Sequence, residues 1–265
     1  MNTLGFIKIT LPLKTNLFDE LISSSNFESV AKGRIGNHLV KVEENRIPIV
    51  RTTTQYNVPP QNFSNIHNFI VEEINNVLRN SEFCDLYPTN FNNALIEVYD
   101  NTYSKMGFHS DQSLDLDSNS YIGLFSCYKN PESLVEHRLR KLTVKEKDAN
   151  EEFEIILTHN SVVLFSVETN RKSLHKITLN SVNNQKLTQS DNQWLGITFR
   201  KSKTFIKNRN NEPYFLNGEV LKLANEEQRT EFFKLRGQEN RLSDFVYPEL
   251  SYTISIADTL MPIDK

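Results

Sequence analysis

The sequence has little cysteine, no long apolar run and no charge excess. Its two cysteines, Cys84 and Cys127, exclude a small scaffold built on disulfides. No run approaches the roughly 18 apolar residues that a membrane span needs. Lys8, Lys14 and Asp19 interrupt the first segment, so we expect no signal peptide. The expected location is therefore the cytoplasm, with no membrane partner.

Charge and composition further narrow the class of protein. Thirty Lys and Arg residues stand against 33 Asp and Glu, and the formal net charge of −3 excludes a strongly basic protein that coats nucleic acid. The hydrophobic fraction of 38%, with 17 Phe, offsets the entropy of ordering and excludes a disordered chain. Only 8 Gly and 9 Pro are present, and we find no repeat or linker. We therefore predict a single domain over residues 1–265.

Helical spacing occurs mainly outside the middle of the chain. The clearest predicted helix covers about 62–81, with His67 on its polar side, and a shorter one lies within 15–24. Asn225, followed by an acidic turn and Gln228, predicts the start of another helix. Residues 34–61 are expected to be irregular or extended.

After residue 90 the pattern changes to short runs of β-branched and aromatic residues. The expected strands are 94–99, 121–126, 153–157, 161–165, 174–179 and 194–199. They predict a mainly β fold with flanking helices, whose core is a double-stranded β-helix, or jelly roll. The strands 153–157 and 161–165 are expected to form a hairpin.

The domain would then have three parts. Residues 1–90 would form an N-terminal lid and helical support, and 91–205 the jelly-roll core. Residues 206–265 would be a C-terminal extension, with a possible last strand at 252–256, to which the sequence assigns no role.

The segment His109-Ser110-Asp111 carries the most specific chemistry. On extended chain, positions i and i+2 point to the same side, so an imidazole and a carboxylate converge. His175 is the natural third ligand, because a jelly roll brings its strand face to face with this segment. Two histidines and one carboxylate suit iron and leave one side of it open. Asp115 and Asp117 are alternative carboxylates, but the i, i+2 spacing favours Asp111.

An open iron site needs an electron-rich co-substrate to react with O₂, and 2-oxoglutarate is the common one. The far carboxylate of that dianion requires a charged partner, and the guanidinium fork of arginine matches it. Arg200 ends the predicted strand that follows His175, which makes it the candidate.

Together these segments resemble the AlkB-like 2-oxoglutarate/Fe(II) dioxygenases. Residues 93–126 are similar to the family's strand ending in tyrosine, followed by H-x-D. Residues 161–179 resemble the segment with the second histidine, and the run WLGITFR at 194–200 resembles the closing strand. Residues 47–60 are similar to the approach to the substrate lid. The resemblance covers about 45–205.

The resemblance implies a catalytic iron site of His109, Asp111 and His175, with Fe(II) as cofactor and 2-oxoglutarate and O₂ as co-substrates. It also implies that Tyr99 and Arg200 contact 2-oxoglutarate, together with Thr198 of the T-F-R strand. Ser202 fits an R-x-S pattern found in other 2-oxoglutarate oxygenases.

Two positions depart from the family pattern. Glu97 stands where the family often has asparagine, and Trp194 where it often has a second arginine. Arg200 would then act alone, or Lys203 or Arg171 would compensate.

The resemblance favours oxidative demethylation of alkylated bases in DNA or RNA. In this reaction an N-methyl group is hydroxylated and leaves as formaldehyde. The basic segments 136–147 and 201–209 are candidates for phosphate contacts. The acidic balance and the altered pocket favour an alternative, a hydroxylase of a small molecule or amino acid. A non-enzymatic jelly-roll binding module is a third possibility, and the sequence gives no oligomeric state.

Overall fold

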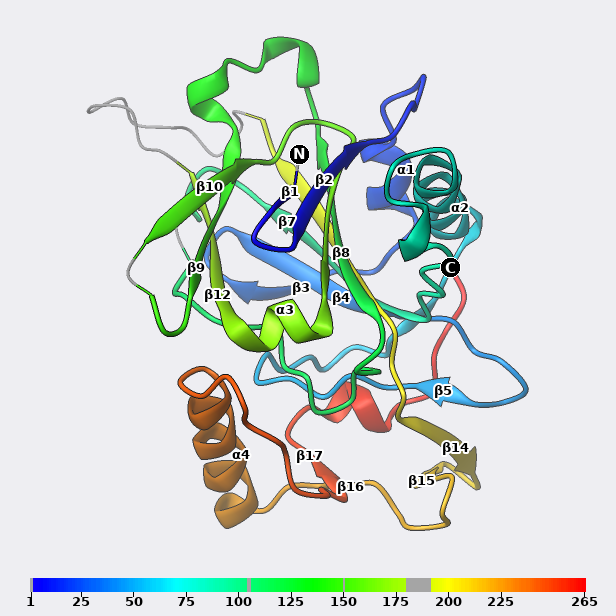
Figure 1. Cartoon of the computed structure of the whole chain (residues 1–265). Coiled ribbons are helices and arrows are strands. Elements are labelled where there is room, and N and C mark those ends of the chain that lie inside the picture. Colours follow the sequence, from blue (N-terminus) through cyan, green and yellow to red (C-terminus); the bar gives the residue numbers. More distant parts are fainter. Residues whose placement is uncertain (1, 104–105, 150, 180–191) are drawn as a thin grey trace.

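The computed structural model describes residues 2–103, 106–149, 151–179 and 192–265, and antiparallel sheets dominate it (Figure 1). A large sheet has the order β1-β2-β11-β8-β13-β7-β4-β3, with β6 pairing in parallel with β4. The bounds of these strands are β1 Asn2–Thr3, β2 Phe6–Thr10, β11 Ser161–Ser166, β8 Tyr121–Tyr128, β13 Trp194–Arg200, β7 Asn93–Tyr99, β4 Arg34–Val40, β3 Glu28–Ala31 and β6 Gln61–Asn62.

A smaller sheet faces the large one and has the order β10 (Glu152–Ile156), β9 (Arg140–Glu146) and β12 (Ser173–Leu179). Apolar side chains of both sheets pack between them, among them Leu124 and Phe165 of the large sheet and Leu142 and Ile177 of the small one. The two sheets form the jelly-roll core that the sequence predicts.

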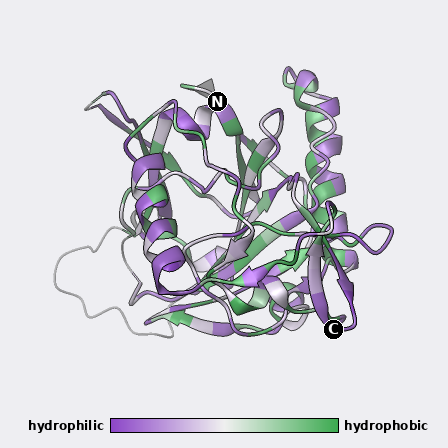
Figure 2. Cartoon of the chain, turned by 90° about the horizontal axis from the view of Figure 1, so that it is seen from below, coloured by the Kyte–Doolittle hydropathy of each residue, from purple (hydrophilic) through white to green (hydrophobic). Residues whose placement is uncertain are grey.

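Helices α1 (Phe18–Ser23) and α2 (Asn65–Arg79) cover the outer face of the large sheet. The apolar stripe of α2 packs into the same cluster as the outward side chains of β8 and β13. The members of this stripe are Ile66, Ile70, Ile74 and Leu78. In Figure 2 the hydrophobic colour concentrates on strands and helix faces, while the peripheral loops are mostly hydrophilic.

The C-terminal segment forms a third layer below the core in Figure 1. It contains the strands β14 (Phe205–Arg209) and β15 (Glu212–Phe215), helix α4 (Glu226–Glu239), and the parallel pair β16 (Lys222–Leu223) and β17 (Tyr252–Thr253). Strand β5 (Ile47–Pro48), from the N-terminal part of the chain, pairs with β14 and completes the small sheet β15-β14-β5. The remaining elements are α3 (Val167–Lys172) and the short 3-10 turns Cys84–Leu86, Pro131–Ser133, Glu136–Arg138 and Ile256–Thr259.

Helix α4 begins with the predicted capping box, in which Asn225 and Gln228 bond each other's backbone N–H groups. The last strand is shorter than predicted and ends at Thr253. None of the helices in the described ranges is long and apolar enough to cross a lipid bilayer.

The predicted hairpin is wrong. Strand β10 pairs with β9 in the small sheet, whereas β11 pairs with β2 and β8 in the large sheet. The turn between them passes from one sheet to the other at Asn160, which has a φ of 59° and donates its N–H to the carbonyl oxygen of Ser126. A short polar link is compatible with both arrangements, and the partner strands decide between them.

Residues 34–40, in the stretch expected to be irregular or extended, form strand β4, and β9 covers part of the basic segment 136–147. The expectation for His67 is corrected. His67 is fully buried and does not lie on a polar face. Its Nδ1 accepts the N–H of Ser64 at 3.0 Å, and its Nε2 lies 3.2 Å from the hydroxyl of Ser24. Burial lowers the pKa of His67 to about 4, so this histidine is a neutral structural group.

Candidate metal and co-substrate site

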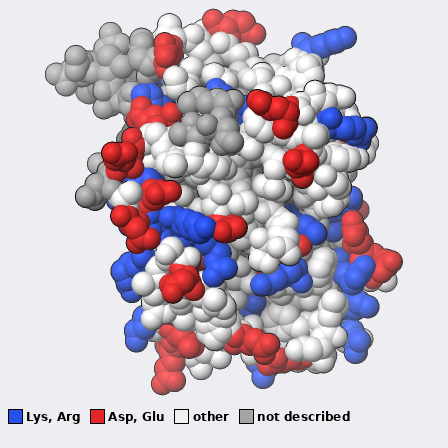
Figure 3. All heavy atoms as spheres, in the orientation of Figure 1, with Lys and Arg blue, Asp and Glu red and all other residues white. Residues whose placement is uncertain are grey.

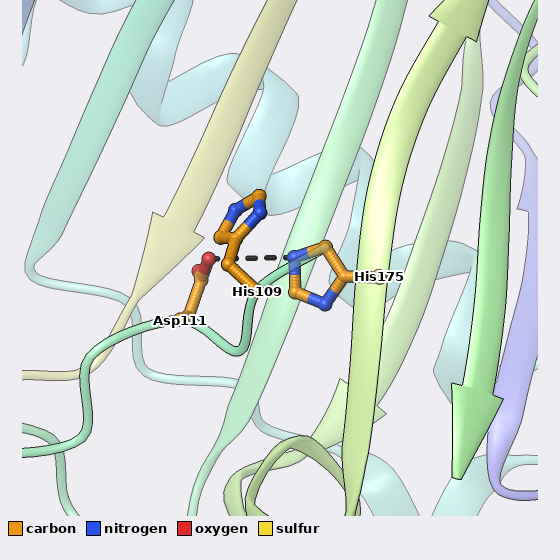
Figure 4. A group of neighbouring side chains, drawn as sticks. All are labelled: His109, Asp111 and His175. Atoms are coloured by element: carbon orange, nitrogen blue, oxygen red, sulfur yellow. Dashed lines mark ion pairs between the residues drawn. The ribbon is translucent and has the colours of Figure 1, made fainter. Parts of the chain in front are cut away.

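Backbone pairing brings the two candidate histidines together. His109 and His175 form an isolated antiparallel bridge, in which each N–H donates to the other's carbonyl oxygen at 3.0 and 2.7 Å. Their rings are 4.7 Å apart. Asp111 lies two residues further along, and one ligand atom from each of the three residues lies within 4.8 Å of the others. In Figure 4 the carboxylate and both imidazoles converge on one region.

The H-x-D segment is held from both sides. The side chain of Asn170 in α3 accepts the N–H of Asp111 and donates to its carbonyl oxygen, both at 2.8 Å. Asn240, at the end of α4, accepts the N–H of Ser110 at 3.1 Å, and the Arg236 guanidinium donates to the Ser110 carbonyl. These bonds fix the direction of the His109 and Asp111 side chains.

The charges at the site suit a metal ion. Burial alone would raise the pKa of Asp111, but the Arg200 guanidinium at 3.0 Å and the imidazoles hold it well below its usual range. Burial and the neighbouring His175 lower the pKa of His109 to about 3. Its Nδ1 donates to the Gly107 carbonyl at 3.0 Å, which leaves the Nε2 lone pair free to bind a metal.

Two buried nitrogen atoms at the site have no hydrogen-bond partner among the described residues, and they indicate which kind of ligand the site can bind. Nη1 of Arg200 and Nδ1 of His175 are both buried without a hydrogen-bond partner. An unfilled guanidinium donor beside two imidazoles and one ionised carboxylate fits an anionic chelator on a divalent metal. This donor set therefore fits Fe(II) and 2-oxoglutarate.

The alternative carboxylates lie elsewhere. Asp115 forms a buried ion pair with Arg51 at 2.7 Å, and Asp117 pairs with Lys201 at 2.9 Å. Among the described residues, Asp111 is the carboxylate that joins the two histidines.

A cavity of about 400 Å³ opens onto the three residues. Tyr99, Thr198 and Arg200 line it, as expected for residues that contact a co-substrate. Ser202 is not among the lining residues. Its hydroxyl donates to the Ile49 carbonyl at 2.6 Å and accepts the N–H of Thr204 at 3.0 Å, so it shapes the chain that leaves β13.

The two compensating cations also lie elsewhere. Lys203 and Arg171 line a second cavity of about 640 Å³ between the core and the C-terminal segment. Arg171 donates to the Phe245 carbonyl at 2.7 Å. Neither residue lines the cavity that contains His109 and His175.

Several lining residues were not found from the sequence. Arg34 of β4 enters the cavity paired with Glu97, and α4 contributes Phe233, Arg236 and Asn240. These residues come from far along the chain and form no local motif. The only signal was Glu97 itself, because a buried acid at this position requires a cationic partner.

The family model of the 2OG-Fe(II) oxygenase superfamily matches residues 18–200, more than half of the chain. The chain belongs to this superfamily. It is accordingly a 2-oxoglutarate-dependent Fe(II) dioxygenase, an oxidoreductase that uses Fe(II), 2-oxoglutarate and O₂. The expected membership of the 2-oxoglutarate/Fe(II) oxygenases and the expected cofactors are confirmed, and a non-enzymatic binding module is set aside.

Solved structures similar to this 2OG-Fe(II) oxygenase include OsALKBH1 and a prolyl-4-hydroxylase from Pseudomonas putida. OsALKBH1 is 16% identical with a TM-score of 0.46, and the match covers 74% of this chain and 96% of that one. The prolyl-4-hydroxylase is 13% identical with a TM-score of 0.42, covering 74% and 92%. Among curated proteins, no relative matches the sequence.

Proposed function

We propose that His109, Asp111 and His175 bind Fe(II), and that Arg200, Tyr99 and Thr198 contact 2-oxoglutarate. The support is the convergence of the three ligand atoms and the unfilled donor of Arg200. When bound, iron and co-substrate supply the oxidation of a C–H bond by O₂, with release of succinate and CO₂. The chain positions these groups: Arg200 keeps Asp111 ionised, and Asn170 fixes its backbone.

We propose oxidative demethylation of an alkylated base in nucleic acid as the reaction. The observation that carries this proposal is the environment of Phe108, which lines the cavity. The ammonium groups of Lys176 and Lys145 lie 3.9 and 4.6 Å from the centre of its ring. Both ammonium groups lie over the ring, so a base that stacks on Phe108 would displace an ammonium group from the ring face. The displaced ammonium group would then contact a flanking phosphate.

This arrangement gives a role to part of the basic segment 136–147, since Lys145 belongs to it. Lys176 also lies 3.6 Å from Glu152, so the local charge is partly balanced. Figure 3 shows basic side chains gathered beside acidic ones on the face around α3 and above α4. The segment 201–209 does not border the cavity, and Lys201 is paired with Asp117. We therefore expect moderate, salt-sensitive binding to nucleic acid.

The test is substrate-stimulated turnover. We expect a methylated oligonucleotide to stimulate release of succinate and formaldehyde, and to bind less tightly as salt rises. Phe108→Ala with Lys145→Ala and Lys176→Ala should lower oligonucleotide affinity by roughly tenfold or more. Lys201→Ala is the matched control and should change little. A salt slope near zero, or stimulation by free metabolites alone, would contradict nucleic-acid repair.

A hydroxylase of a small molecule or amino acid is the second candidate, and helix α4 favours it. Phe233, Arg236 and Asn240 add a wall to the cavity, and such a wall suits a compact substrate. In the same assay, this candidate requires turnover of free metabolites without any response to oligonucleotides. With either substrate, we propose that residues 206–265 are part of one catalytic domain with the core.

A further inference from the structure

The two departures from the AlkB-like pattern lie on neighbouring strands of the large sheet. Trp194 of β13 is opposite Tyr99 of β7, and Tyr99 is in turn opposite Arg34 of β4. Position 194 itself supplies no cation: the indole is buried, donates to the Ser126 hydroxyl at 2.7 Å and lies over Gly196. A cation is nevertheless present in this row of the sheet, two strands away.

Glu97 anchors that cation. Nε of Arg34 donates to Oε1 of Glu97 at 2.8 Å, and one Nη donates to the same oxygen. The hydroxyl of Tyr99 donates to Oε2 at 2.5 Å, and the hydroxyl of Tyr56 to Oε1 at 3.3 Å. The Arg34 and Glu97 side chains are only 13% and 7% exposed. Glu97, which stands where the AlkB-like pattern often has asparagine, therefore holds the Arg34 guanidinium in place.

Gly36 makes room for the Glu97 side chain and its hydrogen-bond partners. Glu97 stands between Gly36 and Gly196 in the sheet register. A Cβ at Gly36 would lie 2.9 Å from the Tyr56 hydroxyl and 3.1 Å from Cγ of Glu97. A side chain at Gly36 would therefore crowd the network that orients Arg34, whereas one at Gly196 would collide with the indole of Trp194.

Arg34 retains charge and donors for a ligand. Burial alone would lower its pKa, but the Glu97 carboxylate outweighs burial and raises it. The two bonds to Glu97 use two of the five N–H donors of the guanidinium. Arg34 and Arg200 both line the cavity, but Arg200 pairs with Asp111 at the metal end. The cavity is therefore lined by two separate cations, Arg200 beside the metal ligands and Arg34 beside Glu97.

We propose that Arg34, held by Glu97, binds the far carboxylate of 2-oxoglutarate in place of the arginine that β13 lacks. This inference rests on the proposed iron and co-substrate site. The rival is Arg140 of β9, whose guanidinium lies 5.1 Å from the Tyr99 ring and 5.7 Å from the Trp194 ring. Its two Nη atoms donate to the carbonyls of Tyr103 and Asp100 at 2.8 Å, and it is not among the cavity-lining residues.

The test compares two 2-oxo acids by anaerobic titration of the Fe(II) protein, followed by the visible charge-transfer band. 2-Oxopentanoate has the length of 2-oxoglutarate but lacks the far carboxylate. The wild-type protein should prefer 2-oxoglutarate. Arg34→Met should weaken 2-oxoglutarate binding by roughly 10- to 100-fold, the range expected for a lost charge-assisted hydrogen bond. Its affinity for 2-oxopentanoate should stay within about twofold.

Two further variants separate recognition from side effects. Arg34→Met leaves Glu97 unpaired, and that charge would itself repel a dianion. In the double variant Arg34→Met/Glu97→Gln the repulsion is absent, and the preference should still be lost. Arg140→Met should keep the preference. If Arg34→Met does not fold by circular dichroism, Arg34→Lys replaces it in the comparison, with a smaller loss expected because lysine lacks the fork.

Three outcomes would overturn the inference. They are a wild-type protein that binds both acids equally, a double variant with the wild-type preference, and loss of the preference in Arg140→Met but not in Arg34→Met. Failure of the underlying site gives a different result, because then the wild-type protein shows no band with either acid.

Discussion

At the scale of single residues, the metal ligands project from a backbone whose pairing does not depend on their side chains. The His109–His175 bridge consists of main-chain bonds. His175→Ala should therefore keep the local fold and remove only a ligand. We expect at least 100-fold weaker binding of Fe(II) or Mn(II) and no charge-transfer band with 2-oxoglutarate, since one of three protein ligands is lost.

The matched control is His159→Ala. His159 lies in a turn, where its Nδ1 accepts the N–H of Tyr128 at 3.1 Å, away from the cavity. This variant should bind metal as the wild type does. An unchanged metal affinity in His175→Ala would refute the assignment of this residue as a ligand.

A second residue-scale prediction concerns Asp258, which is buried in the C-terminal segment. Burial, with the charge of Asp115, raises its pKa to about 7 from an ordinary value of 3.8. The folded state thus favours the protonated acid. Its contribution to stability is complete below about pH 4 and is lost as the pH rises through about 7.

Asp258→Asn should consequently flatten the dependence of unfolding free energy on pH between about 4 and 7, and should make the protein more stable than wild type at pH 8. Urea unfolding at pH 5 and pH 8 measures both effects. Identical pH slopes in the two proteins would show that Asp258 titrates normally.

At the scale of elements, helix α4 acts as a brace for the H-x-D segment. Glu239, which is 2% exposed, accepts the N–H and hydroxyl of Ser113 at 2.8 and 2.7 Å and pairs with Arg236 at 2.8 Å. Glu239→Ala leaves these donors unsatisfied. We expect a loss of roughly 2–4 kcal/mol in unfolding free energy and weaker metal binding, measured by urea unfolding and metal titration.

Glu226→Ala, at the exposed start of the same helix, is the control and should change stability by less than about 0.5 kcal/mol. If Glu239→Ala lost stability but kept full metal affinity, α4 would support the fold without bracing the site.

Local patterns predicted the elements and ligands that are themselves local. Helical spacing located α2, short runs of β-branched and aromatic residues located β7 and β13, and the i, i+2 geometry brought His109 and Asp111 together. Features decided by partners distant in the chain were missed. His67 lies on a helix turn that faces Ser24 and not solvent, and a short polar link left the pairing of β10 and β11 open.

The same reason explains the missing cation. The sequence left three alternatives for the cation missing at position 194: Arg200 acting alone, Lys203 or Arg171. The structure presents Arg34, because the order β13-β7-β4 places an N-terminal strand two positions away in the sheet. In the sequence, Glu97 was only a departure from the family pattern. In the structure it forms an ion pair with Arg34.

At the scale of the whole molecule, the cavity is the meeting point of three parts of the chain. Strand β4 supplies Arg34, the core supplies His109, Asp111 and His175, and α4 closes the wall with Arg236. A ligand that contacts all three parts should stabilise each of them against unfolding. Metal and co-substrate are thus expected to stabilise the entire chain and not only the jelly roll.

This coupling gives the last prediction. Mn(II), a redox-stable substitute for Fe(II), should raise the melting temperature, and 2-oxoglutarate should raise it again only when the metal is present. A ligand at 100 times its Kd adds about 2.7 kcal/mol, which for a domain of this size corresponds to roughly 5–10 °C. The His175→Ala protein should show neither rise in the same thermal scans. An equal rise in that variant would place the stabilising metal at another site, because the coupling of the three parts requires the metal to bind where they meet.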